Sequence, residues 1–259
     1  MQFDLYLPRQ TWLHQLDPRT KMMLTLVGLL VCLLFEDPVV LAGVLVAFHL
    51  LLMAADIAWK QLRWLWLRML PLTIMVLFLQ PFFASGAEGQ LLWQLGPVRW
   101  TAEGVLSGVV FALRINGMAF VAAALLFVTE PAHLVRGLVK LGLPFEWGLT
   151  VSLALRYLPT TFGLYQSIYE SQQARGWDPG RGNILRRVRR YLPMLVAVMI
   201  AALRMADNLA MALAARGFGA PFKAPRTTLR DIRFRPVDWV VTGGLLLLLA
   251  GTLFLRYGE

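Results

Sequence analysis

The chain has 259 residues, of which 58% are hydrophobic and only 15% are charged, and its mean hydropathy is +0.61. A soluble globular domain averages about 45–50% apolar and about 25% charged residues, so the composition excludes an ordinary water-soluble domain and indicates an integral membrane protein. The net charge is +10, and such a basic excess is typical of the cytoplasmic loops of membrane proteins. We therefore expect membrane lipids as partners and no nucleic acid.

Five apolar runs are predicted to cross the membrane. Asp17-Pro18 predicts the start of the first helix, because Asp caps a helix and Pro fits its first position. The first two runs have only 15 residues each, fewer than the ~20 that usually span, and we expect them to form a tight, tilted helical hairpin. The five predicted spans are 21–35, 39–53, 69–84, 102–128 and 237–255.

The region around the third span carries interface and turn signals. Tryptophans alternate with basic residues over residues 59–68, a pattern typical of the membrane–water interface. Pro71 and Pro81 predict bends or ends of the span. Residues 91–100 contain two short apolar stretches around Gly96-Pro97, which predicts a β-hairpin on the outer face.

The segment 130–236 differs from the rest of the chain in its charge. It holds sixteen basic and six acidic residues, a difference that equals the net charge of the whole chain. Since basic loops stay inside, we expect this segment and the N-terminus in the cytoplasm and the C-terminus outside. The predicted domains are a membrane domain with four spans (1–129), a cytoplasmic domain (130–236) and a C-terminal span (237–259).

Two long amphipathic helices are predicted inside this segment. Apolar residues recur at steps of three and four along each of them, and Pro159 and Pro193 are expected to bend or restart the helices. The run 191–203 has thirteen residues between Arg190 and Arg204, which argues against a span. The apolar stripes are Leu155, Leu158, Phe162, Tyr165 and Tyr169 in the first helix, and Leu195, Val198, Ala202, Met205, Leu209 and Ala212 in the second.

Both helices end in the same three residues followed by an aromatic, at Ala174-Arg175-Gly176-Trp177 and at Ala215-Arg216-Gly217-Phe218. Capping explains a single end of this kind, because Gly permits a left-handed turn and Arg complements the helix dipole. Two such ends in one cytoplasmic segment favour a docking function. Each Arg can pair bidentately with a carboxylate of a partner, the small residues permit close approach, and the aromatic ring can anchor in an apolar pocket.

Signals for catalysis or metal binding are weak. The sequence has no phosphate-binding P-loop, no His-Glu-x-x-His motif and no paired carboxylates at helical spacing within a span. His14, His49 and His133 are scattered among apolar residues. We therefore expect no catalytic residue, no metal site and no cofactor.

Arg114 and Asn116 are polar residues within the fourth predicted span. A charge at this depth is costly, so it should face protein or water. One interpretation is a residue on a substrate path. The other, which we favour, is a structural hydrogen-bonding post to loop carbonyls or to a carboxylate such as Glu36 or Glu103.

The two Ala-Arg-Gly ends, together with Leu-Asp-Pro-Arg-Thr-Lys at residues 16–21, resemble the transmembrane T component of energy-coupling factor transporters, a group that includes the cobalt-type CbiQ proteins. The resemblance covers residues 13–238. It implies an all-α integral membrane protein of the bacterial or archaeal cytoplasmic membrane, with about five transmembrane helices and a cytoplasmic coupling domain of long amphipathic helices.

The resemblance also implies partners and a mechanical, non-catalytic function. The partners are two cytoplasmic ABC ATPase subunits and a small membrane protein, the S component, that binds the substrate. The chain would transmit ATP-driven motion to the S component for vitamin or transition-metal uptake, with small residues such as Ala202 and Ala206 at a sliding helix contact. The alternatives are an integral membrane enzyme acting on lipid or isoprenoid substrates, and a pore or secondary carrier. The docking residues that the resemblance implies are Ala174, Arg175, Gly176, Ala215, Arg216 and Gly217, flanked by Trp177 and Phe218.

Overall fold

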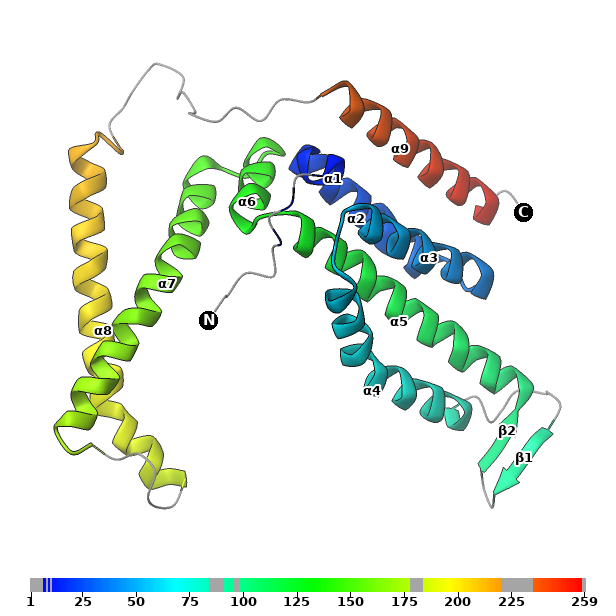
Figure 1. The fold of residues 1–259 in the computed structure, drawn as a ribbon, viewed down its shortest axis with the longest axis horizontal. Coiled ribbons are helices and arrows are strands. Elements are labelled where there is room, and N and C mark those ends of the chain that lie inside the picture. Colours follow the sequence, from blue (N-terminus) through cyan, green and yellow to red (C-terminus); the bar gives the residue numbers. More distant parts are fainter. Residues whose placement is uncertain are drawn as a thin grey trace. The chain divides into compact units, whose positions relative to one another are not determined.

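A computed structural model describes residues 7, 9, 11–83, 91–95, 98–177, 184–219 and 235–257. The chain divides into two compact units, whose ribbon is drawn in Figure 1. Unit 1 combines Met1–Gly148 with Ile232–Glu259, and unit 2 comprises Leu149–Asp231. The described part of both units is almost entirely helical, which confirms the predicted all-α class.

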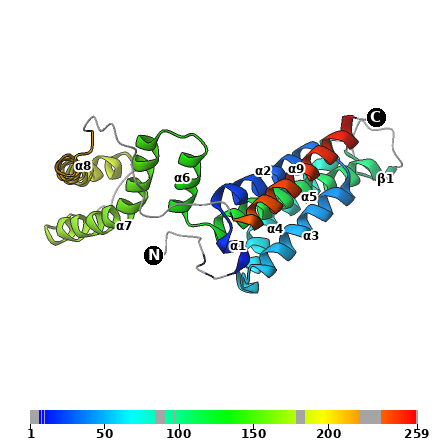
Figure 2. The same ribbon diagram turned by 90° about the horizontal axis from the view of Figure 1, so that it is seen from above.

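Unit 1 contains most of the apolar helices. Two consecutive helices, α2 (Pro18–Leu34) and α3 (Pro38–Ala54), confirm the predicted pair, and α5 has the bounds predicted for the fourth span. Figure 2 shows α9 running alongside α2, although the two are far apart in the sequence. The remaining helices of the unit are α1 (Trp12–Gln15), α4 (Trp59–Phe83), α5 (Ala102–Val128), α6 (Pro131–Lys140) and α9 (Pro236–Tyr257).

Polar side chains just before α2, α3 and α5 cap the starts of these helices. Asp17 and Asp37 each precede a proline, and the Oδ1 atom of each accepts a backbone N–H two residues further on, from Arg19 at 2.9 Å and from Val39 at 2.8 Å. The hydroxyl oxygen of Thr101 caps α5 by accepting the backbone N–H of Gly104, three residues further on, at 3.1 Å. These bonds satisfy N–H groups that a helix leaves unpaired in its first turn, and the helix start predicted at Asp17-Pro18 is confirmed.

The core of unit 1 lies among α2, α3, α4 and α5. Phe120 and Val121 of α5 and Leu52 of α3 are fully buried in it. Gly28 lets α2 come close to its neighbours, because a Cβ atom at this position would lie 2.8 Å from the ring of Phe48 and 3.0 Å from Val121. Small residues at close helix contacts are typical of membrane proteins.

The helix α4 differs from the prediction at its start. It is one helix from Trp59 to Phe83, so it begins before the span predicted from residue 69, and the interfacial position of residues 59–68 stays a prediction. The helix begins earlier because these aromatic, Leu, Lys, Gln and Arg residues include no helix breaker. Pro71 stands inside α4, which changes direction along its course in Figure 1, as expected of a proline that removes one backbone hydrogen bond.

The predicted β-hairpin is present between α4 and α5. The strands β1 (Leu91–Leu95) and β2 (Val98–Thr101) pair antiparallel, with Leu95 opposite Val98. The second strand leads directly into α5. Its position on the outer face of the membrane stays a prediction.

Unit 2 is built from two long helices. They are α7 (Phe145–Ala174), whose first residues belong to unit 1, and α8 (Ile184–Ala215). Pro159 and Pro193 both lie inside continuous helices, so the predicted restart is wrong at both positions. A proline removes one hydrogen bond and the helix can continue beyond it with a bend, and Figure 1 shows α8 changing direction along its length.

Three helices in the described residues are long and apolar enough to cross a membrane by length and composition. The third of them corrects the expectation from the thirteen-residue run, because α8 continues through Arg204 and its apolar stretch has 25 residues. Length therefore does not exclude a span here, although Arg204 and Asp207 stand within it, where charges are costly in lipid. The three segments are Trp59–Gln80, Ala102–Val128 and Tyr191–Ala215, and Pro38–Ala54 and Pro236–Leu247 are shorter apolar helices.

The close packing around Gly28 predicts different effects for two glycine substitutions. Gly28→Ala should destabilise unit 1 by about 1–3 kcal/mol, the usual cost of overpacking. Gly43→Ala in α3 is the matched control, because no described heavy atom lies within 4 Å of the added Cβ. Thermal unfolding of the full chain in detergent, followed by circular dichroism, measures both, and equal midpoints would contradict the close contact.

Candidate functional site

The first Ala-Arg-Gly end closes α7 with backbone hydrogen bonds alone. The N–H of Trp177 donates to the carbonyl of Gln172 at 3.0 Å, and the N–H of Gly176 donates to the carbonyl of Gln173 at 2.9 Å. Gly176 has a φ of 84°, the left-handed conformation that glycine adopts without a steric cost. This is the Schellman turn that ends many helices.

The second end repeats this turn at α8. The N–H of Phe218 donates to the carbonyl of Leu213 at 3.0 Å, and the N–H of Gly217 donates to the carbonyl of Ala214 at 2.9 Å. Gly217 has a φ of 74°. The two motifs therefore share a backbone structure as well as a sequence, and we call them the α7 tip (residues 174–177) and the α8 tip (residues 215–218).

Arg175 and Arg216 occupy the same place in the two tips, between the last helical residue and the glycine. Both side chains are exposed. Neither guanidinium has a hydrogen bond or an ion pair with another residue in the part of the chain that the structure describes. Because backbone N–H groups already close each turn, capping does not require the guanidinium, and both are free to meet a partner.

Two basic residues of unit 1, Lys21 and Arg114, have partners within the fold. The Nζ atom of Lys21 donates to the carbonyls of His14 at 2.9 Å and Val128 at 3.3 Å, and the Nη2 atom of Arg114 donates to the carbonyl of Phe35 at 2.8 Å. Val128 ends α5 and Phe35 follows α2. These cations satisfy carbonyl groups at helix ends, a task that glycine turns perform at the two tips.

Arg114 therefore makes the structural contact that the sequence analysis favoured. Besides the loop carbonyl, its guanidinium lies 3.8 Å from Glu36, and both residues line a 220 Å³ hollow together with Glu103. Asn116 is buried and its Nδ2 atom donates to the hydroxyl of Thr73 at 2.9 Å. Asn116 thus joins α5 to α4, and a substrate-path role for either residue stays a prediction.

Trp177 contacts aromatic residues of its own unit. Its ring packs edge-on against Tyr169 of α7, with centroids 5.6 Å apart, and against Tyr191 of α8 at 5.2 Å. The side chain is half-buried in this contact. The α7 tip is therefore held against the first half of α8 by aromatic packing, which sequence periodicity did not indicate. The docking role expected of Trp177 and Phe218 stays a prediction.

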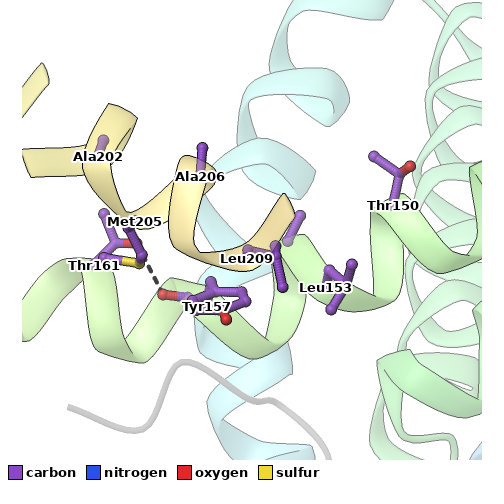
Figure 3. A pocket seen from close by; sticks show the side chains of 9 residues that line it. Thr150, Leu153, Tyr157, Thr161, Ala202, Met205, Ala206 and Leu209 are labelled. Carbon is purple, nitrogen blue, oxygen red and sulfur yellow. Dashed lines mark hydrogen bonds between the residues drawn. The ribbon is translucent and has the colours of Figure 1, made fainter. Parts of the chain in front are cut away.

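An apolar groove of 410 Å³ separates α7 from α8 (Figure 3). The hydroxyl of Thr161 is turned back to the carbonyl of Tyr157 at 2.9 Å, so it adds little polarity. Both helices contribute to its lining, and the sliding contact predicted between them stays a prediction. Its lining is Thr150, Leu153, Ala154, Tyr157 and Thr161 from α7 and Ala202, Met205, Ala206 and Leu209 from α8.

Of the two apolar stripes, only the one on α8 lines this groove. Ala202, Met205 and Leu209 of the α8 stripe line it. The α7 stripe does not line it, and Leu158 and Phe162 are 45% and 38% exposed. The groove is lined by another side of α7, which includes Leu153 and Tyr157, so the function of the exposed α7 stripe stays a prediction.

The histidines lie apart from one another in packed or capping positions. In the described residues no group of three or more His, Cys, Asp or Glu side chains can hold a metal ion. His49 packs with its ring 5.4 Å from that of Phe120 and 5.9 Å from that of Trp59. His14 is hydrogen-bonded to the hydroxyl of Thr11 at 2.7 Å, and burial lowers its pKa.

Comparison with known proteins assigns the chain to a family. The family model described as cobalt transport protein (CbiQ) matches residues 9–228. The chain belongs to this family. It is 30% identical to the energy-coupling factor transporter transmembrane protein of Acidaminococcus fermentans, over 98% of this chain and 96% of that protein. It is also 30% identical to the protein of the same name from Lacticaseibacillus paracasei, over 97% of each chain.

The family and the fold agree on the class of protein. The relatives are named as transmembrane proteins of transporters, and this chain has several helices able to span a membrane. The relatives' names give no support to the alternative of a lipid or isoprenoid enzyme. This CbiQ-family chain is a multi-pass membrane protein, and its two tips are its candidate functional site.

The tip geometry predicts that Gly176→Ala misplaces Arg175. A Cβ atom in the left-handed conformation costs about 1–2 kcal/mol, so the turn should open and binding of a partner at the α7 tip should weaken. Gly176→Asn should be milder, because Asn tolerates this conformation. Gly163→Ala inside α7 is the matched control, since a Cβ there meets no described atom.

These variants are measured by partner co-purification and by the thermal midpoint of the purified chain. Gly163→Ala should match the parent chain in both. If Gly176→Ala binds its partners as tightly as Gly163→Ala does, the left-handed turn is not needed to present Arg175.

Proposed function

We propose that this chain is the transmembrane coupling subunit of an energy-coupling factor importer in the cytoplasmic membrane. Two ABC ATPase subunits dock on the α7 and α8 tips, and their ATP-driven motion passes through α7 and α8 to a substrate-binding S component for vitamin or transition-metal uptake. Hydrolysis takes place in the ATPases and not in this chain. The observation that carries the proposal is the pair of identical turns that present exposed arginines.

The tips support docking on two similar partner surfaces. Each presents one planar guanidinium beside a small Ala and a Gly, with no partner for the cation in the described chain. Such a group pairs best with a carboxylate in bidentate geometry. Two equal tips match two ATPase subunits that each offer an acidic groove.

The exposed apolar surface of α8 supports a membrane partner. Large apolar side chains of this helix are more than 45% exposed, whereas single-chain soluble proteins rarely expose contiguous apolar patches of this kind. We propose that the S component covers part of this surface and lipid covers the rest. The residues concerned are Leu192, Leu195, Val196, Met199, Ile200, Leu203 and Met211.

Arginine substitutions test the docking role. Arg175→Ala and Arg216→Ala should each weaken ATPase association roughly 10- to 150-fold, because a lost hydrogen bond to a charged group costs about 1.5–3 kcal/mol and about 1.4 kcal/mol is tenfold in affinity. The ATPases are first identified as the subunits that co-purify with the tagged chain. They are then titrated onto each purified variant in nanodiscs.

The control is Arg204→Ala, which removes an exposed arginine from the middle of α8 and leaves both tips intact. It should bind the ATPases as the parent chain does. Unchanged ATPase binding by the Arg175→Ala/Arg216→Ala double variant would overturn the docking role.

A further inference from the structure

Three charged residues are buried together at one end of unit 1. Asp238 is 1% exposed, Asp17 4% and Lys21 6%. Asp17 and Lys21 belong to the Leu-Asp-Pro-Arg-Thr-Lys stretch at residues 16–21, which takes no part in the proposed docking. Buried charges are retained where they are paired and hydrogen-bonded. The side chains of Asp238 and Lys21 bond distant parts of the chain, whereas the carboxylate of Asp17 accepts the nearby N–H of Arg19 and its Oδ2 atom has no hydrogen-bond partner in the described residues.

Asp238 fastens the start of α9 to the start of α2. Its Oδ1 atom accepts the backbone N–H of Asp17 at 2.9 Å, and its Oδ2 atom accepts the backbone N–H of Arg235 at 2.8 Å. The first bond joins residues 221 positions apart in the sequence. The side chain of Arg235 adds a bond to the Oε1 atom of Gln15 at 3.2 Å. The chain that returns from the coupling segment is thus attached to the first turn of α2.

Lys21 fastens the end of α5 to the same turn. Its Nζ atom donates to the carbonyl of Val128, the last residue of α5, and to that of His14. The next helix, α6, also packs here, because a Cβ atom on Gly137 would lie 3.1 Å from Pro18. The chain that leaves for the coupling segment is therefore attached to the first turn of α2 as well.

The three charges are placed so that they support one another. Asp17 and Asp238 lie at the N-terminal ends of α2 and α9, and Lys21 meets the C-terminal end of α5, so each charge faces the favourable end of a helix dipole. Burial disfavours the charge of Lys21, and both carboxylates offset part of this cost through space. Removing the ammonium would leave two buried carboxylates without compensation, which is costly in a medium of low dielectric constant.

We propose that the first turn of α2 is a common anchor for both ends of the coupling segment, and that Asp17, Lys21 and Asp238 are positioning residues for the two tips. The anchor holds Val128, where the chain enters the coupling segment, and Arg235, where the chain leaves it. It thereby limits the spacing that the α7 and α8 tips can adopt. This inference rests on the proposed docking function.

Hydrogen exchange measured by mass spectrometry on the full chain in nanodiscs tests the anchor. Lys21→Met should speed amide exchange roughly tenfold in both α6 and the first turn of α9, as expected when a buried pair loses its compensation. Asp37→Asn is the control, because Asp37 also precedes a proline and caps its helix but is exposed and lies outside the cluster. It should change neither region. Unchanged exchange in α6 or in α9 of Lys21→Met would overturn the common anchor.

A charge-balanced variant separates the anchor from simple misfolding. Asp238→Asn in the Lys21→Met chain removes one uncompensated carboxylate, so the double variant should exchange more slowly in α6 than Lys21→Met alone. Additive damage would overturn the role of charge compensation, because independent sites add and coupled ones do not.

The role in positioning the tips is tested by ATPase titration in two backgrounds. With both tips present, a fixed spacing raises the effective concentration of the second contact, so Lys21→Met should weaken binding roughly tenfold. In the Arg175→Ala chain only one tip binds, spacing has no influence, and Lys21→Met should have no further effect. An equal loss in both backgrounds would overturn the positioning role. The docking function itself would fail separately, through unchanged binding by Arg175→Ala.

Discussion

The structure depends on how its helices end. A helix leaves backbone N–H groups unpaired at its start and carbonyl groups unpaired at its end, and an apolar environment offers no water to satisfy them. At the starts of α2, α3 and α5 the side chains of Asp17, Asp37 and Thr101 accept these N–H groups. At the ends of α2 and α5 it uses Arg114 and Lys21, whose long side chains reach the carbonyls of Phe35 and Val128.

The same constraint separates cations that are bound within the fold from cations that stay exposed. In unit 1 a basic side chain that satisfies helix carbonyls is bound within the fold and has little left to offer a partner. At the tips of α7 and α8 the glycines take the left-handed turn, the backbone closes itself, and the arginines stay exposed. The glycine of each motif is therefore what makes its arginine available, and Ala-Arg-Gly is best understood as one unit with two tasks.

Much of the fold and of the candidate site can be predicted from the sequence, because short patterns of residues specify these local structures. Asp before Pro at residue 17, the apolar run 102–128 and the two Ala-Arg-Gly ends each specify a local structure, and the structure has them. The sequence misses features that need long-range contact, such as the bonds of Asp238 and the packing of Trp177 on Tyr191. An apolar periodicity also does not say which of two apolar sides of α7 meets the neighbouring helix.

Two charged residues within α8 indicate what contacts its apolar stretch. The helix is long enough to span, yet Arg204 and Asp207 stand exposed in its apolar stretch. In lipid each would cost about 2.5–3.5 kcal/mol at the centre of a span. A protein partner can satisfy both groups and still cover the apolar side chains around them. The mixture of charge and apolar surface on one helix therefore favours contact with protein along this stretch, which is what a helix that carries motion between subunits requires.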